Sequence, residues 1–121
     1  MANLEQMLDT LAGIDGVEVA VIASRDGLVI AERHTQENDL AEALGATSAS
    51  LLNNIEALAS DLGRGSVTQA IVELAEGLAV LQPAGPVAVL TVVVGSSVNL
   101  GRVRLALRKH EALVQQAVAD L

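Results

Sequence analysis

Hydrophobic residues along this chain either recur at helical spacing or form short runs typical of strands. The two patterns predict eight elements. In the first segment the apolar residues recur at helical spacing, which predicts a short helix. Asn3 can cap this helix with Gln6 reaching back, and Gly13 can end it in the left-handed conformation. The apolar face of the helix consists of Leu4, Met7, Leu8 and Leu11.

Two runs rich in β-branched residues follow, residues 17–24 and 28–33, and Asp26 and Gly27 lie between them. Asp-Gly between two apolar runs is a strong signal for a β-hairpin, and a type I′ turn gives both residues positive φ. We therefore interpret Asp26 and Gly27 as structural turn residues. Both hairpin faces are then largely apolar, so we expect helices above and below the sheet. The predicted partners are Arg25 with Leu28, Ser24 with Val29, Ala23 with Ile30, Ile22 with Ala31, Val21 with Glu32 and Ala20 with Arg33.

Residues 39–62 are predicted to form the longest helix, with Asp39 as its cap and Glu42 three residues later. Its large apolar side chains form a continuous stripe, here called the leucine stripe, which we expect to face the sheet. The leucine stripe consists of Leu40, Leu44, Thr47, Leu51, Ile55, Leu58 and Leu62.

A second stripe on the same helix carries only small or short polar side chains, and Leu52 falls outside both stripes. Small side chains let two helices approach closely. A solvated face more often carries Lys and Glu, so we predict self-association through this small-residue stripe; the alternative is that Ala and Ser fill a solvated face. The small-residue stripe consists of Ala43, Ala46, Ser50, Asn53, Ala57 and Ser60.

Three further strands are predicted over residues 66–74, 78–82 and 87–94. Their connections are too short for anything but antiparallel hairpins. The third run is apolar on both faces and suits the centre of the sheet. The first carries more polar groups and suits an edge, where unpaired backbone groups invite another strand. This edge strand, following a small-residue helix stripe, is a candidate dimer seam.

Residues 99–121 are predicted to form one final helix. The element order is helix, two strands, helix, three strands, helix. This order predicts an α+β fold, in which a five-stranded antiparallel sheet has helices on both faces, within one domain over residues 1–121. The apolar side of the last helix consists of Leu100, Val103, Leu107, His110, Val114, Ala117 and Leu121.

Composition excludes several functions. The chain has 15 acidic and 7 basic residues and no aromatic residue, so it repels phosphate backbones and cannot stack on bases. Its unbroken apolar runs are far shorter than the roughly 20 residues that cross a bilayer. It has no cysteine, and its first residues lack a secretory pattern. We expect a cytoplasmic protein with neither a nucleic-acid partner nor membrane insertion.

No catalytic pattern stands out. The chain has no cysteine nucleophile, no phosphate-binding glycine motif and no histidine pair at metal-ligand spacing. His34 has Glu37 and Asp39 nearby, but we interpret it as a solvated loop histidine and not as a metal ligand. His110 is expected to be a partly buried structural histidine. We therefore expect no enzyme activity, no catalytic residue, no metal and no cofactor.

Four of the seven basic residues gather at the start of the last helix. Two lie on each rim of its apolar stripe, and one leucine lies on the outward side. Positive charge near a helix N-terminus opposes the macrodipole, so an acidic group should compensate it. That group is either one of the chain's own surplus carboxylates or an acidic patch on a partner. This candidate second partner surface consists of Arg102, Arg104, Leu105, Arg108 and Lys109.

These segments carry a resemblance to a known family. Residues 13–32 (GIDGVEVAVIASRDGLVIAE), the helix rich in alanine and serine, and residues 88–109 (AVLTVVVGSSVNLGRVRLALRK) together resemble the roadblock family. The family includes roadblock-type dynein light chains and bacterial regulators of gliding-motility Ras-like GTPases. The matching signals are Gly16-Val17, Ser24-x-Asp26-Gly27-Leu28 and Asn99-Leu100-Gly101, and the resemblance covers nearly the whole chain.

The resemblance implies a profilin- and longin-like fold and a dimer formed through the middle helix and the third strand. It implies a noncatalytic homodimer whose paired helices form a platform for a small Ras-like GTPase, either modulating GTP hydrolysis or acting as a scaffold. The alternative is a ligand-sensing or assembly module of a signalling system, for example with a sensor kinase and without a GTPase. The candidate dimer or partner interface consists of Ala43, Ala46, Ser50, Leu52, Asn53, Ala57, Ser60, Val67, Gln69 and Ile71.

Overall fold

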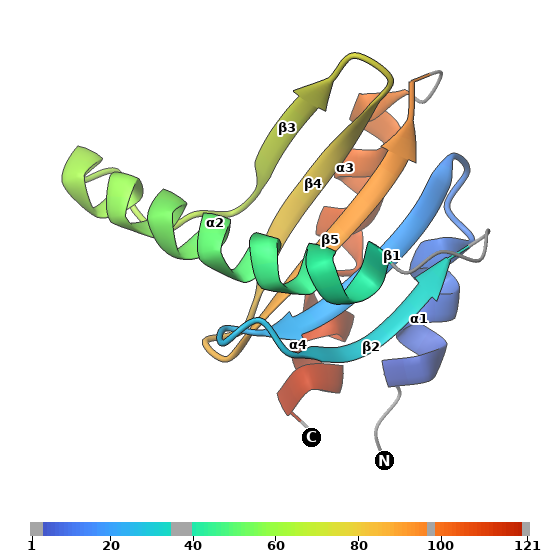
Figure 1. Ribbon diagram of the computed structural model, residues 1–121, viewed down its shortest axis with the longest axis horizontal. Helices are drawn as coiled ribbons and strands as arrows, with labels where there is room; N and C mark the ends of the chain where they lie inside the picture. The colour runs from blue at the N-terminus through green and yellow to red at the C-terminus, as the bar shows by residue number, and fades with distance from the viewer. Residues whose placement is uncertain (1–3, 35–39, 97–98, 120–121) are drawn as a thin grey trace.

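The computed structural model describes residues 4–34, 40–96 and 99–119, in which five antiparallel strands form one sheet in the order β2-β1-β5-β4-β3 (Figure 1). The predicted fold class is therefore confirmed, with β5 at the centre and β3 at an edge. The predicted caps Asn3 and Asp39, together with Glu37 and Leu121, lie outside the described residues. The elements are α1 (Leu4–Ala12), β1 (Val17–Ser24), β2 (Val29–His34), α2 (Leu40–Leu62), β3 (Ala70–Leu74), β4 (Gly77–Ala84), β5 (Ala88–Gly95), α3 (Leu100–Lys109) and α4 (Glu111–Ala119).

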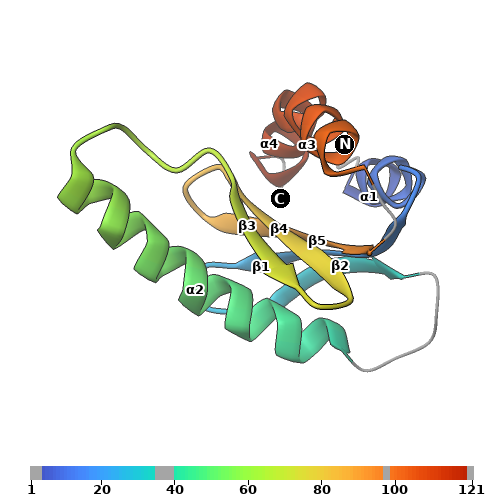
Figure 2. The same ribbon diagram turned by 90° about the horizontal axis from the view of Figure 1, so that it is seen from above.

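The helices lie on both faces of the sheet, as predicted. Figure 2 shows α2 alone on one face and α1, α3 and α4 together on the other. The larger core lies on the three-helix face, where Met7, Leu8 and Leu11 of α1 pack in one buried cluster with Leu90 of β5 and Leu107 of α3. The α2 face holds two smaller clusters, built mainly from valine and alanine around Leu52. The three-helix face therefore contains most of the buried apolar volume.

The turn between β1 and β2 differs from the predicted type I′ turn. The N–H of Ser24 donates to the carbonyl of Leu28 at 2.9 Å, and the N–H of Gly27 donates to the carbonyl of Ser24 at 2.9 Å. The loop therefore has three residues, 25–27, and Gly27 has φ of +93° whereas Asp26 does not have positive φ. Such a loop needs one left-handed residue, and glycine takes that place without a steric cost.

The extra loop residue changes the register near the turn. Away from it the predicted pairs hold: Ala20 lies opposite Arg33, Val21 opposite Glu32 and Ile22 opposite Ala31. Closer to the turn Ala23 lies opposite Val29 and not opposite Ile30, because the register shifts between Ile22 and Ala23. An irregularity of this kind accommodates the extra residue and leaves the apolar pattern unchanged in the part of the hairpin away from the turn.

Three further predictions about helix and strand ends were wrong. Gly13 is not left-handed; the chain reverses at Gly16, which has φ of +92° immediately before β1. The strand predicted over residues 66–74 is regular only from Ala70. The predicted single C-terminal helix is two helices, because His110, with φ of −97° and ψ of 5°, closes α3. This break lets α3 and α4 each bury its own apolar side, including Val103 and Val114.

Candidate interaction surfaces

The side of α2 that faces the sheet is made of small residues. Gly45 lies so close to β2 that an added Cβ would be 3.0 Å from the Cγ2 atom of Val29. Small side chains on the inward side therefore let the helix approach the sheet closely. Leu52, which fell outside both predicted stripes, is fully buried at the centre of this contact. The buried residues of α2 are Ala41, Gly45, Ser48, Ala49 and Leu52.

The leucine stripe does not face the sheet, so that prediction was wrong. Leu40, Leu58 and Leu62 are 56%, 56% and 61% exposed. The stripe lies along one flank of α2, because the inward side is occupied by Ala41, Gly45, Ser48, Ala49 and Leu52. Of its other members, Leu44, Leu51 and Ile55 are half-buried and Thr47 is exposed. The described chain therefore leaves a row of large apolar side chains in contact with solvent.

The C-terminal half of α2 lies beside an open sheet edge. Figures 1 and 2 both show the C-terminal half of α2 projecting past β3, the last strand of the sheet. Leu74 in β3 is 58% exposed. The pairing of Val72 with Ala79 and of Ala79 with Val93 places these side chains, and Leu74 with them, on the α2 face of the sheet. The exposed leucines of α2 and Leu74 of β3 therefore lie on the same side of the sheet.

The small-residue stripe lies on the other flank and the outer side of α2. All six of its members are exposed. The β1–β2 turn approaches it near Ala46, because a Cβ added to Gly27 would be 3.0 Å from the Cα atom of Ala46. The two stripes are therefore separate surfaces of one helix, one large and apolar and the other small and mildly polar.

Four residues of the candidate interface point into the chain's own structure. Leu52 is fully buried, and Val67 is half-buried against its cluster. Ile71 packs against the core of the three-helix face. Gln69 donates through Nε2 to Oε1 of Gln82 at 3.1 Å and accepts from Nε of Arg104 at 3.3 Å. Leu52 is therefore buried within this chain and not exposed to a partner, whereas Val67, Gln69 and Ile71 stay predicted interface residues that also have contacts within the chain.

Arg25 connects three elements and was not singled out in the sequence. Its side chain, 20% exposed, donates through Nε to the carbonyl of Ala88 at 3.0 Å and through Nη2 to the carbonyl of Gly85 at 3.3 Å. Its Nη1 forms an ion pair of 2.5 Å with Oε1 of Glu56 in α2. Arg25 therefore ties the β1–β2 turn and the β4–β5 turn to α2. No sequence signal links it to Glu56, because the two residues are 31 positions apart.

Two open hollows lie below the C-terminal half of α2, with volumes of about 370 Å³ and 300 Å³. Both are lined by Glu56, Ser66 and Val67, and the second also by Arg25. Volumes of this size can hold a small ligand. The guanidinium of Arg25 and the carboxylate of Glu56 are, however, already paired with each other. These two side chains are therefore not free to bind a ligand in the hollows while they remain paired.

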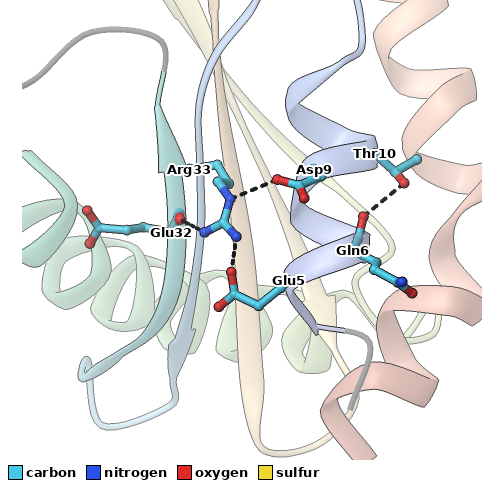
Figure 3. A network of polar contacts seen from close by, with 6 residues as sticks. All are labelled: Glu5, Gln6, Asp9, Thr10, Glu32 and Arg33. Atoms are coloured by element: carbon cyan, nitrogen blue, oxygen red, sulfur yellow. Dashed lines mark hydrogen bonds and ion pairs between the residues drawn. The ribbon is translucent and has the colours of Figure 1, made fainter. Parts of the chain in front are cut away.

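A second polar network joins β2 to α1, as Figure 3 shows. Arg33 pairs with the carboxylates of Glu5 and Asp9, the Nε–Oδ1 distance to Asp9 being 2.9 Å. It also donates through Nη1 to the carbonyl of Glu32 at 2.7 Å. All three charged side chains are partly exposed, so this network holds α1 against the edge strand without forming a buried site.

Both histidines lie where a structural role accounts for them. His34 is the last residue of β2 and not a loop residue, and its Nε2 is 3.5 Å from Oε1 of Glu32. His110 is half-buried between α3 and α4, as predicted. Within residues 4–34, 40–96 and 99–119, acidic and histidine side chains form no cluster able to hold a metal ion. In the same residues no helix combines the length and the hydrophobicity that a membrane span requires.

The structure defines a small α+β domain: a five-stranded antiparallel sheet covered by one helix on one face and three on the other. Residues 3–94 match the family model of the Roadblock/LC7 domain. The chain therefore belongs to the Roadblock/LC7 domain family, as the resemblance predicted.

The chain is similar to several solved structures and to sequence relatives. A solved Roadblock/LC7 domain of Streptomyces avermitilis is 29% identical, with a TM-score of 0.70 over 96% of this chain and 99% of that chain. MglB of Myxococcus xanthus has a TM-score of 0.89 at 20% identity, over 100% of this chain and 98% of that chain. An uncharacterised protein of Methanocaldococcus jannaschii is 28% identical over 88% of this chain and 91% of its own. The arrangement is also that of profilin, with a TM-score of 0.64.

Proposed function

We propose that this protein is a noncatalytic, cytoplasmic homodimer that regulates or scaffolds a small Ras-like GTPase. Membership of the Roadblock/LC7 family supports a regulatory role. The likeness in fold to MglB supports the comparison with GTPase regulators of gliding motility that the sequence resemblance implied. The observation that carries the proposal is the exposed leucine stripe on a helix that projects past an open sheet edge.

The leucine stripe and β3 form the dimer seam in this proposal. A two-fold copy that pairs its β3 antiparallel with this β3 continues the sheet and brings its own α2 alongside the leucine stripe. Burying one leucine side chain fully contributes about 1.5–3 kcal/mol, so Leu58 and Leu62 of both copies supply a substantial driving force. Pairing the two edges also satisfies backbone groups that β3 leaves unpaired on its outer side. One surface thus explains both the exposed leucines and the open edge.

The small-residue stripe is the GTPase platform in this proposal. It lies on the flank of α2 opposite the leucine stripe, so it stays exposed when the dimer forms. Its short side chains allow a partner's backbone or switch segment to approach the helix closely. This assignment differs from the sequence interpretation, in which the same stripe was the dimer seam, because the exposed leucines provide the stronger driving force for self-association.

Two charge insertions on α2 separate these roles. Leu58→Glu places a carboxylate in the proposed seam, where two-fold symmetry buries it twice, so we expect monomers at tens of micromolar. Ala46→Glu, the matched control on the small-residue stripe, should leave the dimer intact. Light scattering coupled to size exclusion measures the mass, with concentration read from peptide absorbance because the chain has no aromatic residue. A monomeric parent protein, or a dimer split by Ala46→Glu and not by Leu58→Glu, contradicts the proposed seam.

Binding of GTPases tests the second half of the proposal. Small GTPases of the same genome, loaded with GTP or GDP, are titrated against the parent protein and against Ala46→Glu. We expect one GTPase to bind, with a preference between nucleotide states, and Ala46→Glu to weaken that binding at least tenfold while the dimer persists. If none of the GTPases binds in either state, the GTPase part of the proposal is wrong.

A further inference from the structure

The outward side of α3 is here called the basic face and consists of Arg102, Leu105, Arg108 and Lys109. All four residues are exposed, and Leu105 is 70% exposed. At helical spacing Arg102 and Lys109 lie on one side of Leu105, and Arg108 lies on the other. The basic face therefore presents an apolar side chain with positive charge on both sides. It lies on the three-helix side of the sheet, away from α2 (Figure 2), and outside the residues that match the family model.

Two of the three basic residues outside α3 are paired with carboxylates, whereas the third, Arg64, forms no ion pair within the described residues. Arg25 is paired with Glu56, and Arg33 is paired with Glu5 and Asp9. In the described part of the chain, Arg102, Arg108 and Lys109 form no ion pair with a carboxylate, although the chain has 15 acidic residues. Among the described residues, no carboxylate therefore pairs with the charges of the basic face.

The local electrostatics of α3 explain only part of this charge. Arg108 and Lys109 lie in the last turn, where positive charge interacts favourably with the helix dipole. Arg102 lies in the first turn, where positive charge is unfavourable and no acidic residue offsets it. Arg104, at the margin of the face, is held by its hydrogen bond to Gln69. Arg102 is therefore the residue whose charge the fold of this chain does not explain.

We propose that the basic face docks an acidic segment of a partner protein, in which carboxylates flank an apolar side chain. Leu105 would fill the apolar position, and Arg102, Arg108 and Lys109 would pair with the flanking carboxylates. The net charge of −8 opposes binding of the whole chain to an extended polyanion such as nucleic acid or an anionic membrane. A single exposed leucine is also too little apolar surface to hold a helix in a bilayer. Because the face lies opposite α2, this docking goes beyond the proposed function and can occur in the dimer.

The probe is a synthetic amphipathic peptide with leucines at helical spacing flanked by glutamates. It is titrated into the full-length ¹⁵N-labelled protein, and amide chemical shifts report where it binds. We expect saturable shifts centred on residues 102–109, with affinity falling at least about tenfold as salt rises from about 0.05 to 0.5 M. Two peptides of equal length are controls: one with alanine in place of leucine and one with lysine in place of glutamate. Both should bind at least tenfold more weakly.

Arg102→Glu and Arg64→Glu form a matched pair of charge reversals. Arg64 is exposed in the loop after α2, away from α3. Because a glutamate in the first turn improves the helix dipole, Arg102→Glu should fold at least as well as the parent protein. We expect Arg102→Glu to weaken peptide binding at least tenfold and Arg64→Glu to change it less than twofold.

Three results overturn the proposal. One is the absence of shifts in α3 at millimolar peptide. The second is an equal response to the leucine-free peptide or an equal effect of Arg64→Glu, which means nonspecific charge attraction. The third is tighter binding of α3 to vesicles containing phosphatidylserine than to the acidic peptide, which assigns the face to a membrane surface.

Discussion

The two faces of the sheet differ in what fills the space between helix and strands. On the three-helix face, long side chains such as Met7, Leu90 and Leu107 form one continuous buried cluster. On the other face α2 approaches through Gly45 and its small neighbours, and its leucines lie at the flank in contact with solvent. The chain completes the first face by itself. The second face ends in an apolar surface beside an open edge, which is the arrangement expected of an interface.

This difference shows that a stripe of leucines on a helix does not by itself identify the core side. The spacing of apolar residues identifies which side chains lie together, but two neighbouring stripes compete for the inward position. In α2 the close approach at Gly45 leaves no room for a large side chain beside Val29, and Leu52 is the one leucine buried on the inward side. A strongly apolar flank is then available for a second chain.

The largest expected effect is on the free energy of unfolding, when one buried leucine on each face of the sheet is replaced by alanine. Leu107→Ala in α3 should lower the free energy of unfolding by about 3–5 kcal/mol, because the cavity lies in a core bounded by three helices and the sheet. Leu52→Ala in α2 should cost about 2–3 kcal/mol, because α2 alone covers that site and can settle into the space. Urea unfolding followed by far-ultraviolet circular dichroism at one protein concentration measures both. Equal costs would contradict the difference between the faces.

The contact between α2 and the β1–β2 turn can be tested with two glycines. Gly27→Ala should destabilise the protein by about 2 kcal/mol, because the residue needs positive φ and its new Cβ meets the backbone of Ala46. Gly63, also with positive φ, has no atom within 4 Å of an added Cβ. Gly63→Ala should therefore cost only about 1 kcal/mol. If the two variants unfold at the same urea concentration, the turn does not constrain α2.

The anchoring of α2 by Arg25 should have a smaller effect. Arg25→Met keeps most of the side-chain volume but leaves Glu56 without its partner and removes the donors to the carbonyls of Ala88 and Gly85. We expect a loss of about 1–2 kcal/mol. Glu56→Gln, which keeps a hydrogen-bond acceptor, should cost less. Hydrogen exchange of α2 amides should accelerate more in Arg25→Met than exchange in α3; an equal change throughout the chain would argue against a local anchor.

The smallest expected effect is at the exposed network of α1. Arg33→Met should cost about 0.5–1 kcal/mol at low salt, because its partners Glu5 and Asp9 are largely exposed. The cost should shrink as salt is raised, since exposed ion pairs are screened. A urea series at two salt concentrations measures the difference. If the loss of stability in Arg33→Met does not change with salt, Arg33 acts through packing of the aliphatic part of its side chain on the sheet.

Much of the fold could be predicted because local signals were strong. The bounds of β1 agree with the prediction at both ends, and the apolar residues of α1 are buried as its spacing indicated. The pairing of Ala20, Val21 and Ile22 with their partners in β2 follows from the alternation of side chains along a strand. The turn type and the break at His110 could not be predicted, because each depends on one residue's dihedral angles in a packed environment.

The candidate surfaces were less predictable than the fold. The positions of Arg102, Leu105 and Lys109 on an exposed helix side follow from helical spacing alone. The burial of Leu52 and the pairing of Arg25 with Glu56 do not, because they join segments that are distant along the chain. An arginine beside a turn looks the same in the sequence whether it is solvated or anchored.

The sequence by itself determined the order of the elements as far as the C-terminal helical segment, the two-sided apolar sheet and the family, because these depend on short-range spacing and on local motifs. Only the tertiary structure decided which side of α2 faces inward and which arginines have partners. The physical reason is that these outcomes depend on the distance between helix and sheet. That distance is set by small residues such as Gly45 against Val29, and it leaves the leucine stripe outside the core.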